Sequence, residues 1–224
     1  MKRNALHTYC VLALLLAGCG SATPIPTSPR TLTVMTHDSF AVSEEVVVEF
    51  QAQHSAIVKF LASGDAGTLV NQAILNKDVP LADVIFGIDN TLLTRALEAD
   101  ILDAYASPLL AEIPAQFKLD EEQRVTPVDF ADVCLNYDKA YFAEHNLALP
   151  ESLEDLIAPE YSNLLVVENP ASSSPGLAFL LATVGHFGPD GYLDFWVKLR
   201  ANGVKVVEDW ETAYFTEFSG SSGK

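Results

Sequence analysis

Residues 82–88 read ADVIFGI, a short and almost entirely apolar run. Such a run is typical of a central strand in a parallel sheet, which is buried on both faces. Two earlier segments, TLTVMT at 31–36 and AIVKFL at 56–61, are rich in β-branched residues and predict two further strands. A helical spacing of apolar residues follows each predicted strand, at 42–50, 68–76 and 91–99. This alternation predicts an α/β fold with a parallel sheet.

A polar loop follows each of these three strands. The loops contain Asp38, the pair Gly64 and Asp65, and the pair Asp89 and Asn90. Because the carboxyl ends of parallel strands meet at one edge of a sheet, the three loops are expected to form a binding rim. Each loop also has a simpler interpretation as a turn or a helix cap, with Asp65 and Asn90 beginning the next helices.

The second half of the chain repeats the α/β alternation. Residues 106–125 are irregular and acidic, and 126–137 (TPVDFADVCLNY) predict a pair of strands. We therefore expect two α/β lobes, residues 31–124 and 125–224, joined by a hinge near 125–130. A capping box of Ser152 and Asp155 predicts the start of a helix, and a strand is predicted at 164–167. A second helix is predicted from the serine run to Phe187, where Gly188 ends it, and a third at 192–200. A strand at 204–207, the start of an aromatic helix at 210–218 and a loop at 219–224 complete the prediction.

The N-terminus has the pattern of an export signal. Lys2 and Arg3 precede an apolar stretch at 9–16, and small residues lead to Cys19. The pattern resembles a bacterial lipobox, which predicts a signal peptide at 1–18, a lipidated Cys19 and a tether at 19–30. The protein is then expected outside the cytoplasm, anchored in the membrane by lipid, at the cell surface or in the periplasm. The alternative is an ordinary secretory signal with a chance cysteine.

Composition excludes several classes of function. The net charge of −17 argues against nucleic acid as a partner and favours a cationic ligand. With Cys10 in the apolar segment and Cys19 lipidated, Cys134 is the one remaining cysteine, so no disulfide framework is expected, and we interpret Cys134 as a buried strand residue. Histidines are scattered, and nucleophile-elbow and phosphate-loop motifs are absent from the sequence, so we predict no metal site, no cofactor and no catalytic residue.

Two further motifs could bind a small molecule. Ser173 and Ser174 stand where a helix is expected to begin, and the unpaired amides of a helix N-terminus suit a phosphate group. Alternatively, Ser174 is only the cap of a helix that starts at Pro175. Trp210 and Tyr214 lie one helical turn apart and can share an aromatic face, although such pairs also occur in cores.

Several segments in order carry a resemblance to a known family. They are TVMTHDSF at 33–40, ADVIFGIDN at 82–90, PVDF at 127–130, NYDK at 136–139, SSPGL at 173–177 and WETAY at 210–214. Together they resemble solute-binding lipoproteins of ABC importers with the two-lobed type II periplasmic-binding-protein fold, and among these the thiamine-binding proteins. The family's fold continues beyond the position of Lys224, so the resemblance implies a chain that is truncated at its C-terminus and lacks part of both lobes and of the pocket.

The resemblance implies a site in the cleft between the lobes. Asp65 and Ala66 match an Asp-Gly ligand contact, Ser173 and Ser174 match a Ser-Thr pair at a phosphate or hydroxyethyl pocket, and Trp210 matches a ligand-facing aromatic residue. The resemblance also implies that Asp38 and Asp89 lie in loops facing this cleft, and that Tyr214, one helical turn after Trp210, belongs to the same site. His37 stands where the family has a tyrosine.

The function implied is that of a monomeric binding protein, not an enzyme. It captures thiamine or a thiamine phosphate and delivers it to an ABC permease in the membrane. A polyamine, iron(III) or another small solute remains open as the ligand. An exported enzyme on the same fold and a surface interaction protein also remain open.

Overall fold

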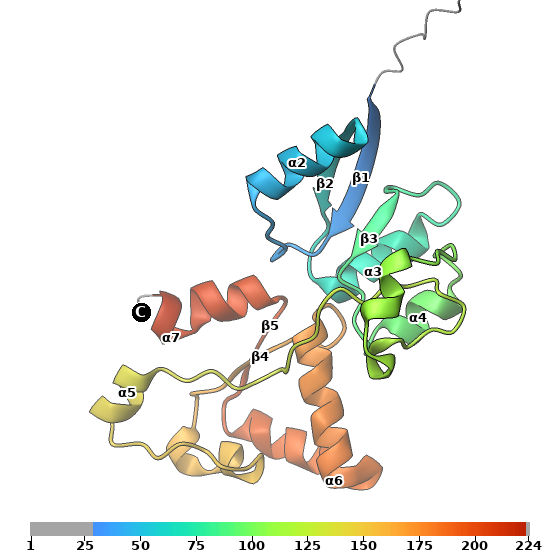
Figure 1. The fold of residues 1–224 in the computed structure, drawn as a ribbon. Helices are drawn as coiled ribbons and strands as arrows, with labels where there is room; N and C mark the ends of the chain where they lie inside the picture. The colour runs from blue at the N-terminus through green and yellow to red at the C-terminus, as the bar shows by residue number, and fades with distance from the viewer. Residues whose placement is uncertain (1–28, 223–224) are drawn as a thin grey trace, which may run out of the picture. The chain divides into compact units, whose positions relative to one another are not determined.

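Strand β1 (Arg30–Thr36) lies in the middle of a three-stranded sheet in the computed structural model, which describes residues 29–222. The sheet has the order β2-β1-β3, with β2 at Ala56–Ala62 and β3 at Val84–Phe86 (Figure 1). β1 and β3 run parallel, with Val34 opposite Val84. All three predicted strands are therefore confirmed. The predicted signal peptide at 1–18, Cys19 and the tether up to residue 28 lie outside the described residues.

The prediction that 82–88 forms the central strand is wrong within this sheet. β3 is only three residues long and lies at the edge, and β1 is central. Gly87 follows β3 with φ at +122°, a backbone conformation that side chains disfavour and that ends the strand. An apolar run predicts burial, but the order of the strands depends on pairing between distant segments.

Three helices accompany this sheet, α2 (Glu44–His54), α3 (Ala66–Leu75) and α4 (Leu93–Glu98). Asp65 caps α3 as predicted, because its side chain accepts from the Ala66 amide at 2.7 Å. Asn90 is not the cap of α4, because the Asp89 carboxylate accepts from the amides of Thr91 and Leu92, and the helix begins only at Leu93. The buried core of this half consists of Met35, Ala66, Leu69, Val70, Leu92 and Ala96.

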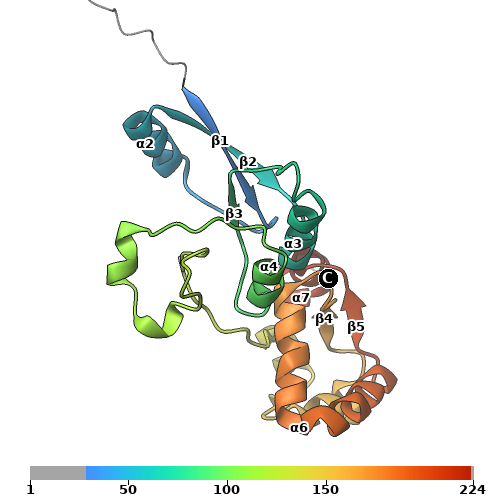
Figure 2. The same cartoon turned by 90° about the vertical axis from the view of Figure 1, so that its right-hand side faces the viewer.

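The segment between α4 and α5 is mostly irregular, as Figure 2 shows. It contains two short 3-10 turns, η2 (Pro108–Glu112) and η3 (Ala115–Phe117). The predicted strand pair at 126–137 is wrong, because the structure describes all of these residues and none of them is in a strand. Cys134 is exposed, so its interpretation as a buried strand residue is also wrong. Without a paired strand to cover it, Phe130 is 76% exposed, and its ring stacks on that of Phe117 with centroids 4.7 Å apart.

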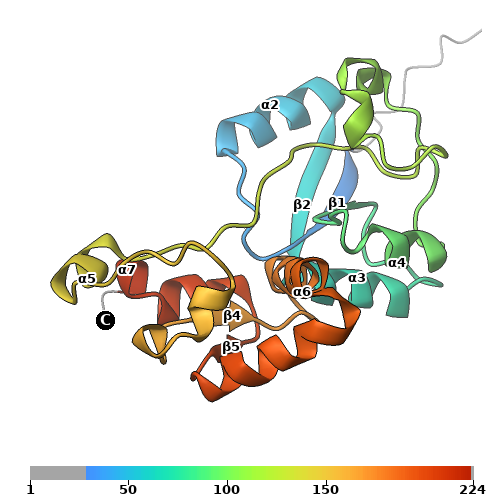
Figure 3. The same cartoon turned by 90° about the horizontal axis from the view of Figure 1, so that it is seen from below.

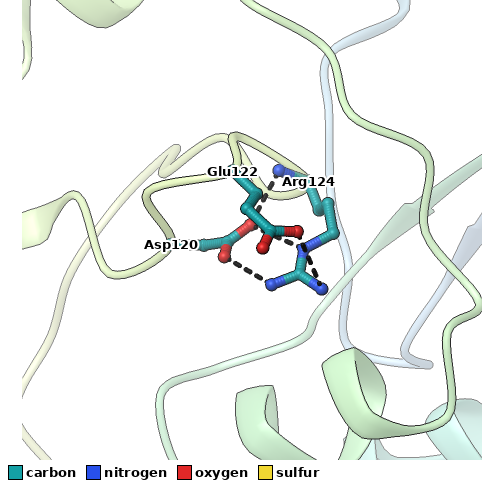
Figure 4. Close-up of polar contacts among 3 residues, drawn as sticks. All are labelled: Asp120, Glu122 and Arg124. Atoms are coloured by element: carbon teal, nitrogen blue, oxygen red, sulfur yellow. Dashed lines mark hydrogen bonds and ion pairs between the residues drawn. The ribbon is translucent and has the colours of Figure 1, made fainter.

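One ion pair fixes a turn in this irregular segment. The Arg124 guanidinium donates to both carboxylate oxygens of Asp120, at 2.7 and 3.1 Å, and also lies 3.5 Å from Glu122 (Figure 4). The Asp120 side chain is 6% exposed. The hydrogen bond from Arg124 lowers the pKa of Asp120 from 3.8 to about 2. A two-pronged contact of this kind holds the turn more firmly than a single surface ion pair.

The second half begins with α5 (Lys139–Glu144) and two 3-10 turns, η4 (Glu154–Ile157) and η5 (Pro159–Tyr161). Ser152 and Asp155 form the predicted capping box, in which each side chain accepts from the amide of the other residue. Strands β4 (Val166–Glu168) and β5 (Lys205–Val207) form a parallel pair. The two sheets thus lie on either side of residue 125 in the sequence, and the division into lobes at that point stays a prediction.

Helix α6 (Ser174–Ala201) contains both predicted helices and bends between them. Gly188 has φ at +73°, and Pro189 follows it, so the helix changes direction where the sequence predicts a stop. The second half of α6 packs Phe195 and Leu199 against Leu156.

The chain then forms the π-helix η6 (Thr212–Glu217) and the short helix α7 (Ser219–Ser222). The loop predicted at 219–224 is wrong for its first four residues. Figure 3 shows α7 next to α5, where the Ser219 hydroxyl donates to the Asp138 carboxylate at 2.8 Å. This long-range contact is invisible in the local sequence, which consists of small polar residues.

Leu199→Ala should lower the free energy of unfolding by about 2–5 kcal/mol, because Leu199 is 1% exposed and its truncation leaves a cavity. Leu193→Ala on the same helix is the matched control. Leu193 is 59% exposed, and its loss should cost at most about 0.5 kcal/mol. Urea unfolding followed by circular dichroism measures both values. Equal losses in the two variants would contradict this account of the core.

The Asp120 carboxylate should make stability depend on pH in acid. Its pKa is lower in the folded chain than the ordinary value of 3.8, so its contribution is fully present above that pH and is lost as the pH falls toward about 2. Asp120→Asn removes this titration. Urea unfolding at a series of pH values from 5 to 2 should give a shallower pH dependence for the variant. Parallel curves for the two proteins would show that the ion pair does not contribute.

Candidate functional site

The first two predicted loops lie side by side. The Asp38 carboxylate accepts from the Gly64 amide at 2.9 Å, and the Asp38 amide donates to the Gly64 carbonyl at 3.1 Å. The ends of β1 and β2 are therefore tied together, as the topology of the sheet predicts. Asp38 remains exposed to solvent.

Asp65 links the start of α3 to the second half of the chain. One carboxylate oxygen caps α3, and the other accepts from the Trp210 amide at 3.2 Å, across a sequence separation of 145 residues. Both oxygens of a half-buried carboxylate therefore hold backbone amides. Ala66 itself is buried and packs in the core with Leu69.

Trp210 and Tyr214 form a stacked pair. Their ring centroids are 4.8 Å apart and their planes differ by 9°. Phe215 meets the edge of Trp210, with centroids 5.6 Å apart. The predicted shared aromatic face is confirmed as a contact, and both rings are partly exposed.

The serine run meets α3 through the backbone. The Gly67 amide donates to the Ser172 carbonyl at 2.8 Å, and a Cβ at residue 67 would lie 2.7 Å from that oxygen. Only glycine allows such an approach. The Ser172 hydroxyl donates to the Glu208 carbonyl at 2.6 Å, which ties the run to the end of β5.

Ser173, not Ser174, is the cap of α6. Ser173 is 1% exposed, and its hydroxyl accepts from the Gly176 amide and donates to the Glu168 carboxylate. Ser174 is the first residue of the helix, and its hydroxyl donates to the Asp89 carboxylate. The other oxygen of Asp89 accepts from the hydroxyl and amide of Thr91, at 2.7 and 2.8 Å.

Glu168 is a residue of this region that the sequence analysis missed. It ends β4, opposite Val207, and its carboxylate is half-buried. Burial raises its pKa, and the nearby carboxylates of Asp65 and Asp209 raise it further, whereas the Ser173 hydroxyl acts in the opposite direction. The signal that could have identified it is its position at the carboxyl end of a parallel strand, which applies equally to Asp38, Asp65 and Asp89.

Two hollows lie elsewhere on the surface. One of about 420 Å³ is lined by Asp38, Glu44, Phe40 and Phe60 among others. Phe40 also contacts Phe60 and Phe86, with ring centroids 5.3 and 4.9 Å away, and the sequence analysis did not identify this cluster. The other hollow, of about 380 Å³, lies beside Asp120. Of the predicted site residues, only Asp38 lines either hollow.

Hydrogen bonds nevertheless bring most of the predicted residues together. Asp38 is tied to the loop of Asp65, Asp65 to Trp210, and Ser174 to Asp89. Among residues 29–222, no group of three or more His, Cys, Asp or Glu side chains is arranged to hold a metal ion. None of the helices described in that range combines the length and hydropathy that a membrane span requires.

The sequence profile of the family described as bacterial extracellular solute-binding proteins matches residues 79–214. The thiamine-binding periplasmic protein of Salmonella typhimurium is 29% identical over 222 residues, which cover 97% of this chain and 64% of that protein. The thiamine-binding periplasmic protein of Escherichia coli K12 is 28% identical, covering 95% of this chain and 63% of that protein. This chain therefore spans a little less than two thirds of the length of these curated relatives.

Solved structures show the same fold. A periplasmic thiamin binding protein superposes with a TM-score of 0.62 at 25% identity, over 84% of this chain and 60% of that one. The periplasmic binding protein P5PA gives a TM-score of 0.64 at 22% identity, over 80% and 58%. These likenesses confirm the predicted type II periplasmic-binding-protein fold. Since the family profile covers more than half of the sequence, the chain belongs to the bacterial extracellular solute-binding proteins.

Proposed function

We propose that this protein captures thiamine or a thiamine phosphate outside the cytoplasm and delivers it to an ABC permease. The similarity to thiamine-binding periplasmic proteins, which extends over 97% of this chain in the first of them, supports the ligand. The observation that carries the proposal is the hydrogen bond from the Trp210 backbone amide to the Asp65 carboxylate, because it ties that carboxylate to the residue whose ring stacks on Tyr214. Thiamine needs both, since its thiazolium ring is a cation and its aminopyrimidine ring needs acceptors.

Binding would require several contacts at once. A single cation–π contact contributes about 0.5–2 kcal/mol, whereas capture at micromolar concentration requires about 8 kcal/mol. We assign the contacts to Asp38, Asp65 and the Trp210–Tyr214 pair, with Ser174 at the start of α6 and Asp89 in the loop after β3. Buried Ala66 and Ser173 support these groups from behind. Closure of two lobes, 31–124 and 125–224, about residues 125–130 would bring the contacts onto the ligand from both sides.

Export and anchoring complete the proposal. The signal peptide at 1–18 directs the chain out of the cytoplasm, Cys19 carries the lipid, and the residues from there to the start of β1 at Arg30 act as the tether. The protein works as a monomer. The family of extracellular solute-binding proteins supports the location.

Calorimetric titration tests the ligand. Thiamine or its monophosphate should bind with a Kd at or below the micromolar range, and spermidine and iron(III) should bind more weakly. Trp210→Ala should weaken thiamine binding by about 2- to 30-fold through the loss of one cation–π contact. The control Tyr105→Ala removes an exposed ring far along the sequence and should leave the Kd unchanged. Preferential binding of spermidine or iron(III) would replace thiamine as the ligand.

Cell fractionation tests the anchor. The protein should sediment with membranes and incorporate labelled palmitate, and Cys19→Ala should abolish the labelling, because the lipid is carried by that sulfur. Cys10→Ala is the control and should leave the distribution unchanged. A wild-type protein that is secreted without label would instead indicate an ordinary secretory signal.

A further inference from the structure

The start of α6 carries two serine hydroxyls, and carboxylates already accept from both. Ser173 donates to Glu168, and Ser174 donates to Asp89. A hydroxyl has one proton, so neither serine can donate to a second acceptor while these contacts last. A helix N-terminus normally favours anions, but here the donors that would reinforce this preference are engaged.

The surroundings of Glu168 are acidic. The negative charges of Asp65, in the loop before α3, and Asp209, in the loop after β5, raise the pKa of its carboxyl group. Within residues 29–222, the basic side chains that form ion pairs contact carboxylates other than Glu168, Asp65 and Asp209. These carboxylates are Asp100, Asp120, Glu122, Glu154 and Glu217. An anionic group that approached Ser173 or Ser174 would thus meet several negative charges that have no ion-pair partner among residues 29–222.

The backbone holds Glu168 in place. Glu168 ends β4 in register with Val207, and Gly176 on α6 lies so close to its carbonyl that a Cβ there would be 2.5 Å from the oxygen. The hydrogen bond from the Ser173 hydroxyl then places the carboxylate next to the first turn of α6.

We propose that Glu168 makes the site select a cationic alcohol over the phosphate ester of that alcohol, so that thiamine is preferred to thiamine monophosphate. This inference rests on the proposed function and names its substrate class. The cationic ring gains from the negative potential, whereas the added phosphate is repelled and finds the serine hydroxyls occupied. Glu168 is thus a specificity-determining residue that acts through charge and through Ser173.

The test compares the Kd values for thiamine and thiamine monophosphate near neutral pH, by calorimetry on the wild-type protein and on Glu168→Gln. Glutamine keeps an oxygen that can accept from Ser173, so the cap of α6 is retained while one charge is removed. The wild-type protein should prefer thiamine by about tenfold or more, and the variant should lose about tenfold of that preference. Glu160→Gln removes one charge from an exposed position in η5 and should leave the ratio unchanged.

The outcomes separate the two proposals. A wild-type protein that binds both ligands with equal affinity overturns the inference, even if Glu168→Gln fails to fold, and leaves the thiamine function standing. An equal ratio in the wild-type protein and a folded Glu168→Gln also overturns it. If the wild-type protein binds neither ligand, the proposed function fails and the inference fails with it. Ser173→Ala should keep most of the preference for thiamine, because the charge of Glu168 remains.

Discussion

The approach of Gly67 to the Ser172 carbonyl is the constraint on which the candidate site depends. The amide donates at 2.8 Å, and any side chain at residue 67 would collide with that oxygen. This contact joins the first turn of α3 to the loop before α6, which are more than a hundred residues apart in the sequence. The flanking residues follow from it. Asp65 reaches the Trp210 amide, and Ser173 lies against Glu168. Without this close approach of the two backbone segments, the Asp65 and Ser173 side chains would not lie in the same region of the structure.

In the proposed site, acidic groups that cap helices also supply the negative charge that sets the ligand preference. Asp65 and Asp89 accept from backbone amides at the starts of α3 and α4, so their negative charge is fixed in position by the fold. Carboxylates held in this way create a standing potential that attracts a cation without any rearrangement. A ligand that must itself accept hydrogen bonds from Ser173 and Ser174 has first to displace the carboxylates of Glu168 and Asp89. In the proposed site, the chemistry of helix capping would therefore set the charge of the ligand that the region tolerates.

Local signals in the sequence predicted much of the fold. The strands at 31–36 and 56–61, the Asp65 cap and the stacking of Trp210 on Tyr214 depend on spacing within a few residues, and all are present in the structure. The failures involve partners that are distant in the sequence. The edge position of β3, the irregular course of 126–137 and the exposure of Cys134 depend on which segments pair, which composition does not encode.

Part of the candidate site was predicted from the sequence, and part of it was missed. Asp38 and Asp65 were predicted because they follow the carboxyl ends of parallel strands, and a hydrogen bond joins their loops in the structure. Glu168 satisfies the same rule, but it lies within the apolar-looking segment that leads to the serine run and has no motif of its own. Its importance follows from a hydroxyl five residues away and from two carboxylates on other elements, and only the folded chain brings these together.

The bend in α6 has a consequence for local unfolding of the helix. Pro189 lacks an amide hydrogen, and Gly188 has a left-handed φ, so the ladder of backbone hydrogen bonds is interrupted between the two halves of the helix. The half that begins at the serine run and the half that packs Phe195 and Leu199 into the core are therefore not joined by a continuous hydrogen-bond ladder, and we expect them to open as separate cooperative units. Fraying at the far end of α6 then need not loosen the turn that holds Ser173.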